Sequence, residues 1–302
     1  MRTLSVIVPT YNCAGRVIHA LDSIAAQSYP RECIEILVID DGSTDDTQAR
    51  VEAFARQSPV ETRYVVQQNA GPAAARNHGL RLARGDVIAF LDADDWWLPT
   101  KLELQVPLLN GAVGLVYCDT AFVDAHGRPI QNYVRRIRVQ RGNILLPLFC
   151  DFFLLTSSVA LARAAVAEVG QFDESLAVGE DYEFFLRVAQ RFQADCVAEK
   201  LLVRCVRPDS LSRRDYALDA RVDLETLTRF LRDNPQFANH NRDAVKRRIA
   251  SYRYDFAYRL LSENRRREAI VELMRSLQAS ASVGAARTLV RALIRHGVDV
   301  PG

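Results

Sequence analysis

The sequence predicts an α/β fold with a mostly parallel central sheet, helices on both of its faces, and an all-helical C-terminal extension. Between residues 4 and 94, apolar β-branched runs alternate with segments of helical periodicity. Short polar motifs directly follow these runs, and the pattern becomes wholly helical from about residue 217. Strands separated by helices pair in parallel, so both faces of the sheet must be covered.

In chain order, the apolar runs predict four strands, at residues 4–10, 34–43, 62–68 and 86–94. Helices are predicted between them over 14–29, 43–57 and 71–84, with Ser43 or Thr44 capping the second. The carboxyl ends of parallel strands meet at one edge of a sheet, which is where ligands bind in this architecture. The motifs PTYN, DDGSTD, AGPAAARN and DADD therefore gather along one edge.

The rest of the chain is less regular until its last third. We predict one or two strands over residues 113–124 and a basic loop or edge strand over 132–143. We then predict a strand followed by a helix over 157–170, a helix with acids in its first turn over 179–191, and a strand followed by a loop over 202–214. Residues 253–280 predict a helical hairpin. Across its polar turn we expect two facing apolar sets, Tyr254, Tyr258 and Leu261 against Ile270, Leu273 and Leu277.

Charge divides the chain near residue 220. Residues 1–220 carry 23 Lys and Arg against 28 Asp and Glu, a net of −5, whereas residues 221–302 carry 16 against 9, a net of +7. The two sum to the formal net charge of +2. We therefore predict an α/β domain over 1–216 and a basic helical extension over 217–302.

The six cysteines are scattered without a C-x-x-C pair, a pattern typical of reduced thiols in a cytoplasmic protein. The first residues lack the apolar core of a secretory signal, and no window approaches the roughly 18–20 apolar residues of a membrane span. We expect a cytoplasmic protein, with peripheral attachment to the inner face of the membrane as an open alternative.

The motif FLDADDWW places three carboxylates after an apolar run. Asp92 and Asp94 flank one residue, so at a strand end both side chains can point at the same object. One alternative is a solvated turn or a helix cap. The other is a divalent cation, because hard oxygen ligands suit Mg²⁺ or Mn²⁺. Uncompensated charge beside a core is costly, so a nearby positive charge is expected in either case.

Two further motifs border the same edge. In VIDDGSTDDT, the Gly and the Ser are typical turn residues. Asp40 is not explained in this way, because it continues the register of the strand, and its carboxylate could accept a hydrogen bond from the N–H of a nucleotide base. The segment NAGPAAARNHGL offers either a plain helix start or an anion site, in which Arg76 forms a bidentate pair with phosphate. No G-x-G-x-x-G follows any predicted strand, which argues against an NAD dehydrogenase.

As an ordered set, these motifs resemble the family 2 glycosyltransferases of GT-A fold. Five stretches carry the resemblance over about residues 3–215: SVIVPTYN (5–12), VIDDGSTDDT (38–47), GPAAARNHGL (71–80), FLDADDWWLPTKLELQ (90–105) and GQFDESLAVGEDYEF (170–184). The resemblance implies an inverting transfer of a sugar from a nucleotide-diphosphate sugar to an acceptor hydroxyl. It leaves the basic helical extension unexplained.

The resemblance also implies roles for individual positions. It assigns the nucleotide to Pro9, Tyr11, Asp40, Gly71, Arg76 and Asp92, the metal to Asp94, and the catalytic base to Asp181 with Glu180 beside it. As an acid in the first turn of a helix, Asp181 could instead only cap that helix. In the loop beginning at Arg204, Arg207 stands where relatives often have His; it would bind diphosphate but could not ligate a metal.

The leading interpretation is thus a metal-dependent glycosyltransferase, with Mn²⁺ or Mg²⁺ and a UDP-sugar favoured, acting on a glycan or lipid-linked acceptor. A catalytically silent nucleotide-sugar-binding scaffold is the alternative; a nucleotidyltransferase would need a basic Gly-rich loop after the first strand, where PTYNCAGR stands. The basic extension is expected to contact a membrane surface or a second copy of the chain. Nucleic-acid binding is not expected, because no motif accompanies the charge.

Overall fold

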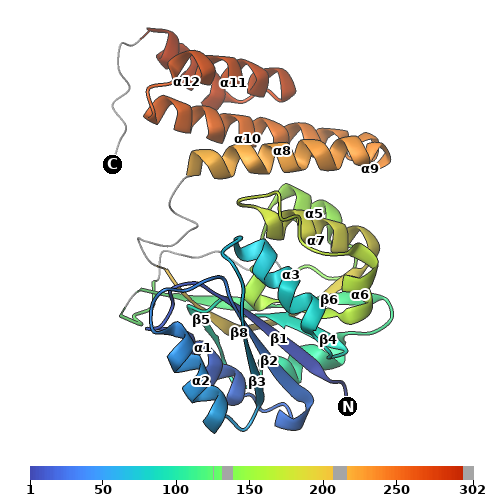
Figure 1. Cartoon of the computed structure of the whole chain (residues 1–302). Coiled ribbons are helices and arrows are strands. Elements are labelled where there is room, and N and C mark those ends of the chain that lie inside the picture. The colour runs from blue at the N-terminus through green and yellow to red at the C-terminus, as the bar shows by residue number, and fades with distance from the viewer. Residues whose placement is uncertain (125, 131–138, 207–215, 295–302) are drawn as a thin grey trace. The chain divides into compact units, whose positions relative to one another are not determined.

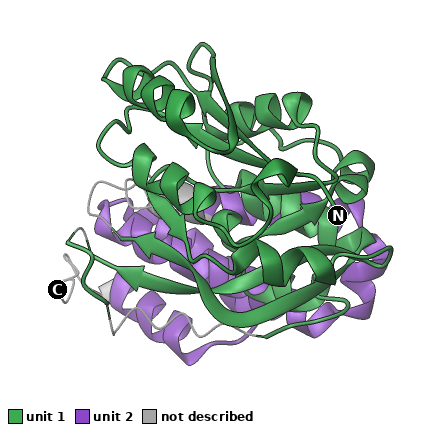
Figure 2. Ribbon diagram, turned by 90° about the horizontal axis from the view of Figure 1, so that it is seen from below, with its two compact units in different colours: residues 1–207 green, residues 208–302 purple. Residues whose placement is uncertain are grey.

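The computed structural model describes residues 1–124, 126–130, 139–206 and 216–294. The chain forms two compact units, Met1–Arg207 and Pro208–Gly302 (Figure 2). The predicted boundary after residue 216 stays a prediction. Arg207, the loop after it and most of the basic segment 132–143 lie outside the described residues. Within the described ranges, no helix is long and apolar enough to cross a membrane.

The described residues of the first unit form one eight-stranded sheet in the order β3-β2-β1-β4-β7-β6-β8-β5 (Figure 1). Its strands are β1 (Leu4–Thr10), β2 (Ile34–Asp40), β3 (Glu61–Val66), β4 (Val87–Phe90), β5 (Asp95–Trp97), β6 (Val113–Val123), β7 (Ala160–Ala162) and β8 (Gln193–Cys205). The four strands predicted between residues 4 and 94 are present, although the fourth ends at Phe90, before the aspartates. Residues 113–123 form one long strand rather than two.

The sheet is parallel where strands and helices alternate and mixed elsewhere. Strands β3, β2, β1 and β4 are all parallel to one another. Strand β7 pairs antiparallel with both β4 and β6, and β5 pairs antiparallel with β8, while β6 and β8 are parallel. The predicted α/β class with a helical C-terminal region is confirmed. The antiparallel strands belong to the irregular middle of the sequence, where the strand–helix alternation lapses.

The helices of this unit are α1 (Val17–Ala25), α2 (Thr47–Gln57), α3 (Pro72–Leu82), α4 (Lys101–Gln105), α5 (Leu145–Cys150), α6 (Arg163–Val169) and α7 (Glu180–Arg191), with short 3-10 turns at Arg31–Cys33, Val106–Leu108 and Thr156–Ser158. Strand β1 shows why both faces are covered. Val6 and Val8 join the core cluster of α1, whereas Ile7 between them points at α3. A Cβ at Gly79 of α3 would lie 2.4 Å from Ile7 Cγ2, so only glycine permits this close packing.

The start of α2 differs from the prediction. Neither Ser43 nor Thr44 caps it, because the helix begins only at Thr47. Ser43 Oγ accepts a hydrogen bond from Asn12 N at 2.8 Å, and Thr44 N donates to Asn12 Oδ1 at 2.8 Å. The two predicted caps therefore join the loop after β2 to the loop after β1. Asp45 takes over the local role, since its Oδ1 accepts from Thr47 N at 3.0 Å.

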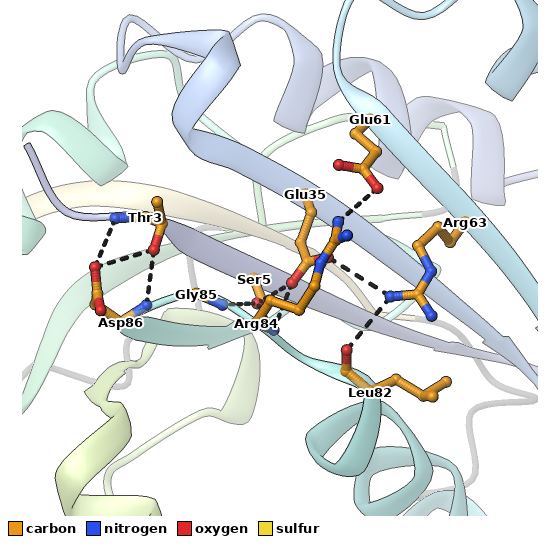
Figure 3. Close-up of polar contacts among 9 residues, drawn as sticks. All are labelled: Thr3, Ser5, Glu35, Glu61, Arg63, Leu82, Arg84, Gly85 and Asp86. Atoms are coloured by element: carbon orange, nitrogen blue, oxygen red, sulfur yellow. Dashed lines mark hydrogen bonds and ion pairs between the residues drawn. The ribbon is translucent and has the colours of Figure 1, made fainter.

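A network of charged residues around the buried Glu35 fixes the amino end of the sheet (Figure 3). Glu35 at the start of β2 accepts hydrogen bonds from Ser5 Oγ at 2.5 Å, Arg84 N at 2.7 Å and Arg84 Nε at 2.9 Å. Arg84 also pairs with Glu61 of β3, and Arg63 lies 3.7 Å from Glu35. These contacts join β1, β2 and β3 to the turn between α3 and β4, and so hold the register of the parallel strands.

The described residues of the second unit are helical: α8 (Tyr216–Asp233), α9 (Pro235–His240), α10 (Arg242–Ser262), α11 (Arg266–Ala279) and α12 (Val283–Ile294). The predicted hairpin is present as α10 and α11. Five of the six predicted apolar residues belong to its core or pack against it, namely Tyr254, Leu261, Ile270, Leu273 and Leu277. Tyr258 does not, since it is 37% exposed, and Ala257 and Leu260 are instead fully buried against Ala269 and Leu273. Small alanines let the two helices approach closely, a contact that a search for large apolar residues does not find.

Candidate active site

Strand order brings the predicted motifs to one edge. Strands β2, β1 and β4 are adjacent and parallel, so the loops that follow them leave the sheet on the same side. Pro9 is half-buried in β1 and Tyr11 just beyond it is 53% exposed. Asp40 ends β2, and Asp92, Asp94 and Asp95 follow β4.

The two aspartates at the end of β2 hold the neighbouring loops. Asp40 is fully buried; its Oδ1 accepts from Ser43 N at 2.7 Å, and its Oδ2 accepts from the hydroxyl of Tyr64. Burial, with the Asp40 hydrogen bond, raises the pKa of Tyr64. Asp41 was assigned no role from the sequence, yet its carboxylate accepts from Ala70 N at 2.9 Å and Gly71 N at 2.8 Å. Asp41 thereby fixes the chain just before α3.

Arg76 joins three separate elements. From α3, its Nη1 lies 2.6 Å from Glu180 Oε1 at the start of α7, and its Nη2 lies 3.0 Å from Asp92 Oδ1 after β4. Arg76 is 6% exposed, and its Nε has no hydrogen-bond partner. Arg76 was predicted to contact phosphate, and in this structure its guanidinium is paired with two carboxylates instead. Sequence reasoning found all three residues but not that they pair with one another.

Asp181 follows Glu180 in the first turn of α7 and is half-buried. Its Oδ2 accepts a hydrogen bond from Thr156 Oγ1 at 3.3 Å, and its Oδ1 accepts from Tyr182 N at 2.8 Å. Loss of solvent, with Glu180 as a second cause, raises the pKa of Asp181 to about 7. A carboxylate with that pKa can both take and release a proton at neutral pH.

Asp95 and Arg204 are two further charged residues of this region, and the sequence analysis assigned neither of them a role. They stand opposite each other in the antiparallel pairing of β5 with β8. Asp95 is 3% exposed, and burial, together with the nearby Asp92, raises its pKa well above the usual range. The aspartates raise the pKa of Arg204 in spite of its burial, with Asp95 the largest contributor among them. The positive charge expected beside FLDADDWW is therefore supplied by Arg76 and Arg204.

A layer of buried residues supports residues 92–95, which we call the aspartate loop. Ser157 Oγ accepts from Asp92 N at 3.1 Å, and the Ser157 carbonyl accepts from Trp97 Nε1 at 2.8 Å. Lys101 Nζ lies 4.0 Å from the centroid of the Trp97 ring and donates to Gln105 Oε1 at 2.7 Å. Lys101 is fully buried, and loss of solvent lowers its pKa to about 8. Trp97, at 2% exposure, is a packing residue.

The chemistry of the aspartate loop suits a divalent cation. Burial, with the nearby Asp92 and Asp94, raises the pKa of Asp95, and the loop presents three carboxylates within four residues. Mg²⁺ and Mn²⁺ take oxygen ligands, and Mg²⁺ commonly needs only one or two carboxylates beside substrate phosphates. Among the described residues, no group of three His, Cys, Asp or Glu side chains is poised as a complete metal site. Asp94, which is half-buried, is the residue that would hold such an ion, since Asp92 is paired with Arg76.

Comparison with known proteins assigns the chain. The model of glycosyl transferase family 2 matches residues 5–168, more than half of the sequence. The protein belongs to this family. An uncharacterized glycosyltransferase of Rickettsia typhi is 32% identical over 199 residues, covering 62% of this chain and 59% of that protein. The amylovoran biosynthesis glycosyltransferase AmsB of Erwinia amylovora is 30% identical over 194 residues, covering 61% of this chain and 63% of AmsB.

Solved structures support the GT-A fold. Staphylococcus aureus TarS 1–349, determined with UDP-GlcNAc, superposes with a TM-score of 0.69 at 20% identity, covering 92% of this chain and 81% of that one. The mannosyltransferase PcManGT of Pyrobaculum calidifontis, determined with GDP-Man and Mn²⁺, gives a TM-score of 0.64 at 24% identity, covering 97% and 79%. Because the first unit ends at Arg207, such coverage extends into the helical unit. The resemblance therefore goes further in structure than in sequence motifs.

Proposed function

We propose that this family 2 glycosyltransferase is an inverting, metal-assisted enzyme that moves a hexosyl or hexosaminyl group from a nucleotide-diphosphate sugar to an acceptor hydroxyl. We place it in the synthesis of a cell-surface polysaccharide or glycoconjugate, with a glycan or lipid-linked acceptor. The relative AmsB is a glycosyltransferase of amylovoran biosynthesis, which supports this setting. The chain spans about 59% of the Rickettsia typhi relative, so the activity of the whole protein is part of the proposal.

The observation that carries the proposal is the placement of Asp181 at the start of α7, where it accepts a hydrogen bond from Thr156 and lies beside Glu180, which Arg76 joins to Asp92. A neutral hydroxyl is a poor nucleophile until a base removes its proton, and the most effective base titrates near the working pH. Asp181 meets that condition with a pKa raised to about 7 by burial and by Glu180. One carboxylate opposite the leaving group suffices for a single displacement with inversion, without the paired carboxylates of a glycoside hydrolase.

The neighbouring residues have supporting roles in this proposal. Arg76 holds Glu180 and Asp92 in place, so it links the base region with the donor region. A bound divalent cation would supply charge neutralisation to the departing diphosphate, with Asp94 as its ligand. Nucleotide contacts are proposed for the residues along the edge, namely Pro9, Tyr11, Asp40, Gly71, Arg76 and Asp92. Arg207 is proposed to contact the diphosphate.

The donor and the cellular setting are proposals as well. UDP-GlcNAc in TarS and GDP-Man with Mn²⁺ in PcManGT support a nucleotide-sugar donor and a divalent cation, with a UDP-sugar favoured. We propose a cytoplasmic location, since all six cysteines are free thiols, as is usual in a reducing compartment. Peripheral attachment at the inner membrane face and pairing of two copies through the C-terminal helices are the two arrangements proposed for the helical unit.

Calorimetric titration tests the donor site. UDP, GDP, dTDP and CDP are titrated with and without Mn²⁺ into the wild type and into Asp94→Asn, with the exposed Asp22→Asn as a matched control. We expect one nucleotide to bind in a metal-dependent manner, with binding lost in Asp94→Asn and kept in Asp22→Asn. Absence of binding for every nucleotide would overturn the proposal. Binding without any hydrolysis or transfer of the corresponding sugar donor would favour the catalytically silent scaffold.

A further inference from the structure

Helix α12 of the helical unit has two contrasting faces. Its inner face is buried, with Ala285 at 0% and Ala292 at 1% exposure against Ala269 and Leu273 of α11. Figure 1 shows α12 beside α11 at this end of the unit. On the outer face, Val283 is 70%, Val290 52% and Leu293 57% exposed. An apolar outer face on a helix of this length requires an explanation, because a solvated face is normally polar.

The exposed residues form one stripe. Val283, Ala286, Val290 and Leu293 are spaced by three, four and three residues, which puts them on the same side of a helix. Arg287 and Arg291, also exposed, run along the border of this stripe at a spacing of four. We call these six residues the α12 outer face. It combines apolar side chains with guanidinium groups and holds no carboxylate.

The surrounding sequence has the same sign of charge. Between Glu272 and Asp299 the chain contains four arginines, at 275, 287, 291 and 295, and no acidic residue. The neighbouring helix α11 also exposes Val271 at 45% and Met274 at 49%. Arg275 is paired with Glu272, so the arginines that border the stripe are Arg287 and Arg291 of α12, a helix without acidic residues. Apolar side chains bordered by these arginines complement a surface that is apolar inside and negatively charged outside. An anionic lipid bilayer has that composition.

The helix is held so that this face points outward. Arg266 at the start of α11 donates through Nη2 to the Leu293 carbonyl at 2.7 Å, and through Nε to the Ala292 carbonyl. A cation at a helix carboxyl end is favourable because the last carbonyls carry partial negative charge. The Tyr254 hydroxyl bonds Thr288 Oγ1 at 3.3 Å, which attaches α12 to α10 as well. Rotation of α12 to bury its outer face would break both attachments.

We propose that the α12 outer face is a docking surface for anionic lipid bilayers, on which the helix lies in the plane of the headgroups. At 12 residues α12 is well short of the roughly 20 needed to span a membrane, so it can only lie at the interface. The contact brings the transferase to a surface where lipid-linked acceptors reside. The docking itself does not depend on the proposed chemistry at Asp181.

Vesicle co-sedimentation of the full chain tests the proposal. Vesicles of pure phosphatidylcholine are compared with vesicles containing phosphatidylglycerol, at low and at near-physiological salt. We expect binding to the anionic vesicles only, weakened by salt because its electrostatic part is screened. Val290→Ser with Leu293→Ser should lower the partition coefficient roughly tenfold or more, since two apolar contacts are lost. Arg287→Gln with Arg291→Gln should also lower it roughly tenfold or more and remove the preference for anionic lipid.

Matched controls come from the first unit. Val66 is 53% exposed, almost equal to Val290, and Arg50 is an exposed helix arginine, so Val66→Ser and Arg50→Gln should leave vesicle binding unchanged. All variants should keep the donor binding of the wild type. Equal binding of the α12 variants and the controls would overturn the proposal. So would a dimer in analytical ultracentrifugation that becomes monomeric in the Val290→Ser, Leu293→Ser variant while vesicles are not bound, because the face would then join two copies.

Discussion

Two clusters of buried charge stand at opposite ends of the same parallel strands. At the amino end, Glu35 is buried but accepts hydrogen bonds from Ser5 and from the backbone and side chain of Arg84, and these lower its pKa although burial acts to raise it. At the carboxyl end, burial and neighbouring carboxylates raise the pKa of Asp95 and Asp181. The first cluster is satisfied by the chain itself. In the second, burial and neighbouring carboxylates favour the protonated forms of Asp95 and Asp181 even though Arg76 and Arg204 lie nearby, which is typical of a functional site rather than of a structural clamp.

The largest effect should come from Asp181→Asn. The change keeps the shape of the side chain but removes the base, so turnover should fall by roughly 10²–10⁴, the usual contribution of a general base. Donor binding, measured by calorimetry, should stay near the wild-type value. Glu35→Gln at the other cluster is the control, and its turnover per folded molecule should be unchanged. Equal turnover of Asp181→Asn and wild type would remove the distinction between the two clusters.

The pH dependence of turnover follows from the same residue. Because the deprotonated form of Asp181 is the active one and its pKa is about 7, turnover should rise about tenfold per pH unit below 7 and level off above it. Asp181→Asn should show a flat residual profile. A wild-type profile without a bend between pH 6 and 8, taken at saturating donor and acceptor, would contradict the assignment.

Removal of Glu35 should affect stability instead. Glu35→Ala leaves the buried Ser5 hydroxyl without its acceptor and removes one of the two acceptors of the Arg84 amide, which should lower the free energy of unfolding by about 2–4 kcal/mol. Urea denaturation measures the change. Glu61 pairs with the same arginine but is 55% exposed, so Glu61→Ala should have a much smaller effect.

The pH response of the Glu35 contribution has a definite sign. Its folded pKa is below the ordinary value of 4.5, so the folded state binds fewer protons than the unfolded state in that range. The stabilisation is fully present above pH 4.5 and is lost as the pH falls through the lowered pKa. Wild type and Glu35→Gln should therefore converge in stability as the pH falls below the lowered pKa of Glu35.

The features of the fold and the site that could be predicted from the sequence are those set by residues close together along the chain. The alternation of strands and helices predicted the parallel half of the sheet and placed Asp92 and Arg76 at one edge, whereas Glu180 was assigned to the site only by the resemblance to family 2 glycosyltransferases. Pairings that join distant segments were not visible: Arg204 opposite Asp95, or Arg76 between Asp92 and Glu180. Asp41 was passed over because a second aspartate in a turn already has a local explanation. The signal that could have identified Asp41 is the pair of adjacent aspartates, Asp40 and Asp41, at the end of the strand.

Lys101 is a buried charge that belongs to neither cluster, so it shows what burial alone does to a charged group. We expect its substitution to have the smallest effect on stability and turnover. Its pKa is lowered by burial to about 8, so the unfolded state holds its proton more firmly and the charged form is disfavoured inside. Stability linked to Lys101 is present above its unfolded value near 10.5 and is lost as the pH falls through 8. Lys101→Met removes a charge that burial disfavours, but it also removes the hydrogen bond to Gln105 and the contact of the ammonium with the Trp97 ring. These opposing effects should largely offset each other, so the free energy of unfolding at pH 7 should change by less than about 1 kcal/mol.

The same substitution also separates charge from shape. Methionine can fill the space beside Trp97 but cannot donate to Gln105, so the layer beneath Ser157 and Asp92 keeps its packing and loses one hydrogen bond. We expect the pH dependence of stability between 8 and 10.5 to become shallower while turnover changes by less than about threefold. A large loss of turnover with unchanged stability would mean that the charge on Lys101 acts on the aspartate loop through Trp97, and that the site includes its supporting layer.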